Sequence, residues 1–205
     1  MNFGIRSIRH PYRFFKWAIC RITHTPKTLY ITFDDGPDPN TTEKVLKILK
    51  EFNVKATFFC TGQNAENCEY LIQKILEEGH AIGNHGYYHL DANKTKSKIW
   101  IENVLKNSPV SNSIFFRPPY GRVFPLQIRK LRSKYRLIFW DVMTYDFKLE
   151  YTPEDVKKII KKYVRDGSII VFHDNILSVP RMIPALKFLI MYYKRKNYNF
   201  ASINL

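Results

Sequence analysis

Short runs of β-branched and aromatic residues alternate along the chain with longer segments in which apolar residues recur every three or four positions. The short runs, bounded by turn residues, predict strands, and the longer segments predict amphipathic helices. The predicted strands are Thr28–Phe33, Lys55–Cys60, His80–Gly83, Ile114–Arg117, Tyr135–Trp140, Ser168–Phe172 and Asn199–Asn204. The predicted helices are Thr41–Phe52, Asn64–Glu78, Asn93–Lys106, Pro125–Ser133, Thr152–Asp166 and Pro180–Lys196.

Strict alternation of strands and helices is typical of βαβ units with parallel strands. This α/β pattern leaves a barrel and an open doubly wound sheet as alternatives. The 205 residues contain no repeat, no low-complexity tract and no linker, so they favour a single domain over residues 28–205. Residues 1–27 precede it as a basic N-terminal extension.

The extension has an amphipathic pattern. Its apolar residues fall on one helical stripe that starts near Pro11 and comprises Tyr12, Phe15, Ala18, Ile19 and Ile22. Arg13, Lys16 and Arg21 lie off this stripe. We favour a helix packed onto the main domain, because a stripe of this spacing usually belongs to a core. The alternative is an interfacial helix on an anionic membrane.

The charge of the chain is strongly positive, with 33 Lys and Arg against 18 Asp and Glu and a formal net charge of +15. This excess predicts attraction to anionic partners such as membrane surfaces, acidic polymers or nucleic acid. Nucleic acid is suggested by charge alone. The basic cluster of Lys157, Lys158, Lys161 and Lys162 interleaves with apolar positions of a predicted helix and fits a solvated face. We therefore expect no nucleic-acid partner.

Cysteine usage and hydropathy predict a cytoplasmic protein. The three cysteines, Cys20, Cys60 and Cys68, are an odd and sparse set, which argues against a disulfide framework and fits a reducing compartment. They form no CxxC motif, which argues against a thiolate zinc site. Basic residues near the start leave no apolar region wide enough for a signal peptide. No uncharged apolar run approaches the ~20 residues of a membrane-spanning helix. The basic extension adds the expectation of peripheral association with an anionic membrane.

Chemistry-bearing residues follow five of the predicted strands. Ligands of parallel α/β folds bind beyond the carboxyl ends of the strands, so these residues would share one rim. The segments are Asp34-Asp35-Gly36-Pro37, Asn84-His85-Gly86-Tyr87-Tyr88-His89, Arg117-Pro118-Pro119-Tyr120-Gly121, Trp140–Phe147 and Val171-Phe172-His173-Asp174. Each segment alone also fits an ordinary polar loop. Together they gather titratable groups in a way that predicts a catalytic pocket.

The first two segments predict a metal site. Adjacent carboxylates repel unless a cation or a proton lies between them. His85 and His89 are four residues apart and could share one face of a helical turn. One carboxylate with two histidines makes a three-ligand set that leaves a coordination position open for water.

The ordered motifs resemble those of NodB-type polysaccharide deacetylases, carbohydrate esterase family 4, from about Lys27 to the C-terminus. The matching residues are Thr32-Phe33-Asp34-Asp35-Gly36-Pro37, His85 with His89, Arg117-Pro118-Pro119-Tyr120-Gly121, Asp146-Phe147 and Val171-Phe172-His173. The resemblance implies a distorted (β/α)7 barrel. It also implies a metal-dependent hydrolase that removes N-acetyl groups from an N-acetylated sugar in peptidoglycan, a chitooligosaccharide or a lipid-linked saccharide.

The resemblance assigns a role to each matching residue. Asp35, His85 and His89 would bind a divalent metal, usually Zn²⁺, with Co²⁺ or Ni²⁺ as alternatives. Asp34 would be the general base that activates the attacking water, and His173 would protonate the leaving amine.

The remaining assignments support these two groups. Arg117 would orient Asp34, Asp146 would tune His173, and the backbone N–H of Tyr120 would stabilise the oxyanion. Phe147, Val171 and Pro119 would contact the substrate.

Three departures from the family pattern concern the pocket. Gly86 stands where Ser or Thr is usual, Phe147 where Trp is usual, and Val171 where Leu is usual. None of them removes a ligand, the base or the acid. The alternatives are a deformylase or an O-acetyl esterase on the same scaffold, or a non-catalytic glycan-binding protein, which would have lost such residues.

Overall fold

The computed structural model describes residue 12, residues 15–106 and residues 108–205. Its strands are β1 Ala18–Ile19, β2 Thr28–Asp35, β3 Thr57–Cys60, β4 Ala81–Asn84, β5 Phe115–Phe116, β6 Arg136–Ile138, β7 Val142–Met143, β8 Ile169–His173 and β9 Asn199–Phe200. Its α-helices are α1 Thr42–Glu51, α2 Gly62–Asn67, α3 Glu69–Glu77, α4 Ser97–Leu105, α5 Pro125–Leu131, α6 Pro153–Tyr163 and α7 Val179–Lys194.

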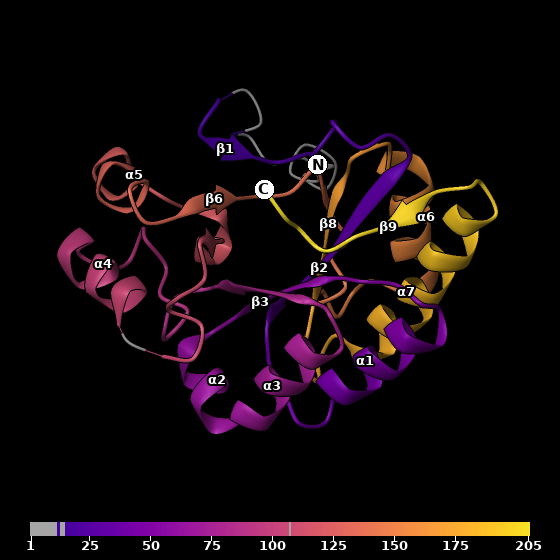
Figure 1. Ribbon diagram of the computed structural model, residues 1–205, viewed down its shortest axis with the longest axis horizontal. Helices are drawn as coiled ribbons and strands as arrows, with labels where there is room; N and C mark the ends of the chain where they lie inside the picture. The colour runs from indigo at the N-terminus through magenta and orange to yellow at the C-terminus, as the bar shows by residue number, and fades with distance from the viewer. Residues whose placement is uncertain (1–11, 13–14, 107) are drawn as a thin grey trace.

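The strands form one curled sheet of parallel pairs. Its order is β1-β6-β5-β4-β3-β2-β8-β7, and β9 pairs with the start of β2. The helices lie along the outside of the curl (Figure 1). Within the described residues no ladder joins β7 to β1, so the sheet is an open half-barrel. The predicted parallel (β/α) barrel is confirmed in this distorted form.

The central strand β2 carries the alternation that positions the site. It lies between β3 and β8 and is buried along nearly its whole length. Leu29, Ile31 and Phe33 pack into the main core with α1 and α7. Successive side chains of a strand point to opposite faces, so Thr32 and Asp34 face the interior of the curl. The general base predicted at Asp34 therefore points into the half-barrel.

The predicted helix over Asn64–Glu78 is two helices. Cys68 ends α2 and precedes α3 with backbone angles φ −134° and ψ 46°, outside the helical region. The first helix also starts earlier than predicted, at Gly62. The two-residue strand β7 was not predicted, because two residues carry no periodicity.

The helical stripe predicted for the extension is wrong where the structure describes it. Ala18–Ile19 is a strand, β1, paired in parallel with Leu137–Ile138 of β6. Ala18, Cys20 and Ile22 are buried while Arg21 between them is exposed, which is the two-residue period of a strand. Pro11, Arg13 and the residues before Pro11 lie outside the described part of the chain.

The described part of the extension nevertheless packs on the rest of the chain. The Tyr12 hydroxyl donates to the Val123 carbonyl at 3.1 Å, and its ring meets Phe139 edge-on with centroids 5.4 Å apart. No helix in the described residues is long and apolar enough to cross a membrane.

Candidate active site and metal centre

Seven of the eleven predicted site residues line one cavity of ≈ 350 Å³ at the carboxyl ends of the strands. Asp34 and Asp35 come from the end of β2, His85 and His89 from the loop after β4, and His173 from the end of β8. The complete lining is Asp34, Asp35, His85, His89, Pro118, Tyr120, Gly121, Arg122, Trp140, Met143, Tyr145, Phe147 and His173.

Three of these side chains, Asp35, His85 and His89, lie close enough together to hold a metal ion. The Oδ1 atom of Asp35 lies 3.4 Å from Nε2 of His89 and 3.8 Å from Nε2 of His85. One donor atom from each of the three residues lies within 4.8 Å of the others. Two imidazoles and one carboxylate fit a divalent cation such as zinc and leave coordination positions open.

Hydrogen bonding and burial keep His85 neutral with its proton on Nδ1, which leaves Nε2 able to bind a metal. Its Nδ1 lies 2.7 Å from the carbonyl oxygen of Arg117, which can only accept, so Nδ1 carries the proton. Nε2 then turns its lone pair toward Asp35. Burial lowers the pKa of His85 to about 4 against the opposing charge of Asp34, so the ring is neutral at pH 7. A donated N–H bond of this kind fixes the orientation of a ligating histidine.

The loop that carries both histidines is not the helical turn that their spacing suggested. Gly86 has φ +77° and His89 has φ +53°. The N–H groups of Gly62 and Gln63, at the start of α2, donate to the carbonyls of Gly86 and Tyr87 at 2.9 and 3.2 Å. The loop is therefore anchored by backbone bonds.

Gly86 is explained by its backbone conformation. A left-handed φ strains any residue with a Cβ, and a Cβ here would lie 3.1 Å from Nδ2 of Asn103. Its N–H donates to Oδ1 of Asn84 at 2.7 Å. Asn84, which is buried, also donates to the Val104 carbonyl and to the Tyr135 hydroxyl. It supports the loop from below and does not line the cavity.

A buried arginine holds the predicted base. Nη1 of Arg117 lies 2.5 Å from Oδ1 of Asp34 and 2.8 Å from Oγ1 of Thr32. Its Nη2 donates to the Phe139 carbonyl at 3.1 Å, and the guanidinium lies 4.0 Å from the centre of the Phe59 ring. The other carboxylate oxygen, Oδ2 of Asp34, is 4.0 Å from Nε2 of His85. One oxygen of Asp34 is thus fixed and the other faces the ligand set.

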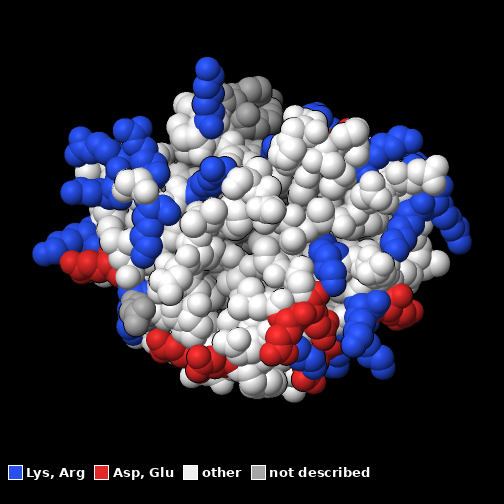
Figure 2. Space-filling model, in the orientation of Figure 1, with Lys and Arg blue, Asp and Glu red and all other residues white. Residues whose placement is uncertain are grey.

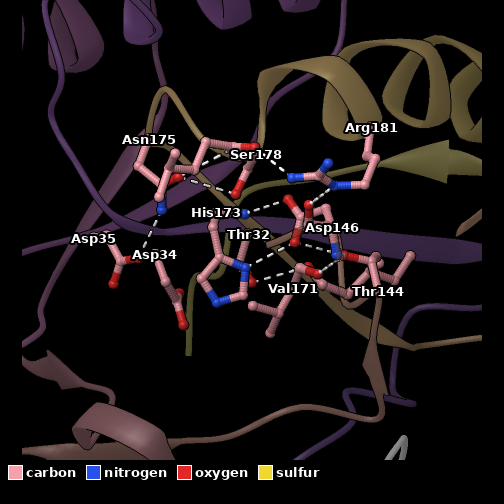
Figure 3. Close-up of polar contacts among 12 residues, drawn as sticks. Thr32, Asp34, Asp35, Thr144, Asp146, Val171, His173, Asn175, Ser178 and Arg181 are labelled. Carbon is pink, nitrogen blue, oxygen red and sulfur yellow. Dashed lines mark hydrogen bonds and ion pairs between the residues drawn. The ribbon is translucent and has the colours of Figure 1, made fainter. Parts of the chain in front are cut away.

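The predicted acid forms a dyad with Asp146. Nδ1 of His173 lies 2.8 Å from Oδ1 of Asp146, and the His173 backbone N–H donates to Oδ2 at 2.8 Å. Figure 3 shows the ring between Asp34 and Asp35 on one side and Asp146 on the other. Burial alone would lower the pKa of His173, but Asp146, with Asp35 and Asp34, raises it to about 9. The imidazole is therefore protonated at neutral pH.

Neighbouring groups fix Asp146 in turn. The single proton of the Thr144 hydroxyl is shared between Oδ1 of Asp146, at 3.1 Å, and the Val171 carbonyl, at 2.7 Å. Nε of Arg181, a buried residue of α7, donates to the Asp146 backbone carbonyl at 2.6 Å.

The third predicted group, Tyr120, lies at the cavity mouth. It sits in a 3-10 turn over Pro119–Gly121 with φ 58°. Its ring is 56% exposed and lies 4.7 Å, between centroids, from the ring of His89. The Phe147 ring meets His173 edge-on at 4.6 Å and forms the opposite wall.

Two of the predicted substrate contacts do not line this cavity. Val171 is fully buried in the middle of β8 and belongs to the main core. Pro119 is buried in its turn, and Pro118 takes the place at the wall. The sequence reasoning missed Trp140, Met143, Tyr145 and Arg122 as lining residues. Their only signal is their place at, or within a few residues of, the predicted strand ends.

Asp174 supports the turn after β2. The Thr42 hydroxyl donates to its Oδ2 at 2.5 Å, and its backbone N–H donates to the Asp34 carbonyl at 2.8 Å. Burial raises the pKa of Asp174 to about 7, aided by the charges of Asp38 and Asp35 and opposed by the Thr42 bond. A Cβ on Gly36 would come within 2.5 Å of Oδ2, so the Asp34-Asp35-Gly36 turn needs its glycine here.

The family model described as polysaccharide deacetylase matches residues 21–137, more than half of the chain. The chain belongs to the polysaccharide deacetylase family. The family predicted from the motifs is therefore confirmed. The match includes Asp34, the three ligand residues and Arg117, and it ends before Asp146 and His173. Asp146 and His173 are included in the candidate site because of the 2.8 Å contact between them.

Two curated relatives are named as peptidoglycan deacetylases. A peptidoglycan-N-acetylglucosamine deacetylase of Bacillus cereus is 33% identical over 172 residues, which cover 77% of this chain and 62% of that protein. The peptidoglycan-N-acetylmuramic acid deacetylase PdaA of Bacillus subtilis is 33% identical over 192 residues, covering 87% and 70%. The chain thus spans less than two thirds of the first relative.

A solved structure extends the likeness over nearly the whole chain. It is the Bc1960 peptidoglycan N-acetylglucosamine deacetylase in complex with 4-naphthalen-1-yl-N-oxidanyl-benzamide. It superposes with a TM-score of 0.79 at 30% identity and covers 91% of this chain and 90% of that one.

Proposed function

We propose that the protein is a metal-dependent deacetylase that removes N-acetyl groups from amino sugars of peptidoglycan. One observation carries the proposal: a cation-ligand set, a carboxylate held by a buried arginine and a protonated histidine share one cavity. These are the groups that hydrolysis of an amide requires. The names of the similar proteins support the peptidoglycan substrate.

The first step is attack of water on the acetyl carbonyl. A divalent metal held by Asp35, His85 and His89 would polarise the carbonyl and make water more acidic. Asp34 accepts the proton of the attacking water at Oδ2, the oxygen that Arg117 leaves free. Arg117 keeps the carboxylate aimed at the cavity, and the Tyr120 N–H would donate to the developing oxyanion.

The second step breaks the carbon–nitrogen bond. His173 is protonated at neutral pH and donates the proton of Nε2 to the leaving nitrogen. Its Nδ1–H remains bonded to Asp146 throughout. Water has then added its oxygen to the acyl carbon, and the products are acetate and the free amine of the sugar.

Replacing Asp146 by Asn should move the alkaline limb of the kcat/KM profile to lower pH. Activity needs protonated His173, so it falls as the pH rises through a folded-state pKa of about 9. Without the Asp146 charge, only Asp35 and Asp34 oppose the effect of burial, so the pKa of His173 falls below its value in the parent. Rates of acetate release between pH 5 and pH 10 measure the shift.

The control for this variant is Asp155→Asn, which changes an exposed carboxylate in the first turn of α6. Its profile should coincide with that of the parent. An alkaline limb that stays in place in Asp146→Asn would show that Asp146 does not set the protonation of His173.

The two relatives act on different sugars, and the choice for this chain is decided by product analysis. Purified peptidoglycan is incubated with the protein and zinc and digested to muropeptides, and mass spectrometry locates the lost acetyl groups. We expect free amines on one sugar type, N-acetylglucosamine or N-acetylmuramic acid. Formylated and O-acetylated saccharides run in parallel test the alternatives of a deformylase and an esterase. Release from these substrates alone would overturn the proposal.

We also propose zinc as the native metal, because two of the three ligands would be imidazole nitrogens.

An anionic membrane is proposed as a partner, because the net charge of the chain is +15. Figure 2 shows Lys and Arg side chains on both flanks of one face, with acidic side chains mainly along its lower edge. Salt-sensitive sedimentation with anionic vesicles measures the association, and none at physiological salt would contradict it.

A further inference from the structure

The loop between β8 and α7 holds an asparagine against the metal-ligand carboxylate. Nδ2 of Asn175 donates to Oδ2 of Asp35 at 3.0 Å. The Ser178 backbone N–H and hydroxyl donate to Oδ1 of Asn175 at 3.1 and 3.0 Å. Figure 3 shows this chain of contacts from Ser178 through Asn175 to Asp35. Asn175 belongs to none of the motifs that identified the site.

The contacts fix which way the amide of Asn175 points. Both Ser178 groups donate, so the oxygen of the amide must face Ser178. The NH₂ group is then left for Asp35. Ser178 is completely buried, at the start of α7, so this orientation is set within the packed part of the protein.

Because of the hydrogen bond from Asn175, the two carboxylate oxygens of Asp35 have different partners. Oδ2 accepts from Asn175, and Oδ1 is the atom that lies 3.4 Å from His89 and 3.8 Å from His85. An N–H donor that occupies one oxygen hinders that oxygen from binding a cation at the same time. The carboxylate can then offer one oxygen to the metal, which leaves more positions for water and substrate.

The backbone of Asp35 makes this support necessary. Its φ of +79° is a left-handed conformation that a residue with a Cβ rarely adopts. Asn64 holds its carbonyl, with Nδ2 to O at 2.8 Å. Within the described residues, Asn175 makes the one side-chain hydrogen bond to its carboxylate.

We propose that Asn175 is a positioning residue that keeps Asp35 a single-oxygen ligand and so sets the affinity and coordination number of the metal centre. The inference rests on the proposed metal-dependent function and deepens it. It concerns the carboxylate that binds the cation and not the proton transfers of Asp34 and His173.

The test is metal binding by the Asn175→Ala variant of the full chain. Apo protein is titrated with Zn²⁺ against a chelator of known affinity, and the Co²⁺ form is examined by visible absorption. We expect metal affinity to fall about 10- to 100-fold, the usual effect of losing a group that orients a ligand. We also expect weaker Co²⁺ absorption bands, because a second carboxylate oxygen would raise the coordination number.

Two variants of the same loop separate positioning from loop stability. Leu177→Ala truncates an exposed side chain (64% exposed) and should bind metal as the parent does. Ser178→Ala removes one of the two bonds that orient Asn175 and should give an intermediate affinity. Thermal unfolding of each apo variant checks that the fold is kept.

The outcomes distinguish this inference from the function on which it rests. Zinc affinity within twofold of the parent and an unchanged Co²⁺ spectrum in Asn175→Ala would overturn the role of Asn175 alone. If Leu177→Ala lost as much zinc affinity as Asn175→Ala, the role of Asn175 would be overturned as well. A parent chain that binds no divalent metal would overturn the proposed function and this inference with it.

Discussion

Replacing Asp34 by Asn is expected to lower kcat by about 100- to 10,000-fold, the range that general-base catalysis contributes. The amide oxygen can still accept from Nη1 of Arg117, so the side chain keeps its place. It cannot take a proton from water at neutral pH. The ligand set of Asp35, His85 and His89 is untouched, and zinc content should stay at one per chain.

The control for this variant is Asp141→Asn. Asp141 is a second buried carboxylate that pairs with an arginine, with Nη2 of Arg165 at 2.8 Å, and it does not line the cavity. This substitution should cost stability but leave kcat near that of the parent. A kcat for Asp34→Asn within tenfold of the parent, in protein with full zinc content, would remove Asp34 from the role of base.

Replacing Arg117 by Met is expected to destabilise the fold by about 3–5 kcal/mol, the cost of breaking a buried ion pair from one side. The guanidinium is fully buried and joins Asp34, Thr32 and the Phe139 carbonyl. Met fills similar volume but leaves a carboxylate, a hydroxyl and a carbonyl without their donor. Urea unfolding at neutral pH measures the difference in free energy.

The matched control is Lys74→Met, which breaks an exposed ion pair with Glu43 at 3.2 Å. Exposed pairs contribute about 0–1 kcal/mol, so its unfolding curve should nearly coincide with that of the parent. Arg117→Lys should fall between the two, because one ammonium cannot reach all three acceptors. A cost for Arg117→Met as small as that for Lys74→Met would show that Arg117 does not hold this part of the sheet together.

The sequence is sufficient to predict which side chains gather at the site, because the ends of the strands can be located in it. The alternating run from Thr28 to Phe33 identifies the central strand, and the next two residues are the paired carboxylates. The same reasoning places His85 and His173 at one rim with them. In a parallel sheet this requires no knowledge of how the loops fold, because the carboxyl ends of all strands share one edge.

What the sequence does not predict depends on loop conformation and on very short pairings. Asn175 reaches Asp35 because the residues after β8 turn back over the site, and no periodic pattern encodes that turn. Strand β1 has only two residues. The apolar residues around it also fit the spacing of a helix, so the sequence does not reveal that burial alternates every two residues here. The motif suggests Val171 as a substrate contact, but its place in the middle of a buried strand leaves it no exposed surface.

We propose that one cavity, loaded with a divalent metal, hydrolyses the N-acetyl group of a peptidoglycan sugar. The most direct test counts acetate and free amine released from purified peptidoglycan by the zinc-loaded protein, by the same protein after chelation, and after zinc is restored. We expect equal amounts of acetate and amine, loss of both on chelation and recovery of both with zinc. Release that survives complete removal of metal, or no release of acetate by protein holding one zinc per chain, would contradict it.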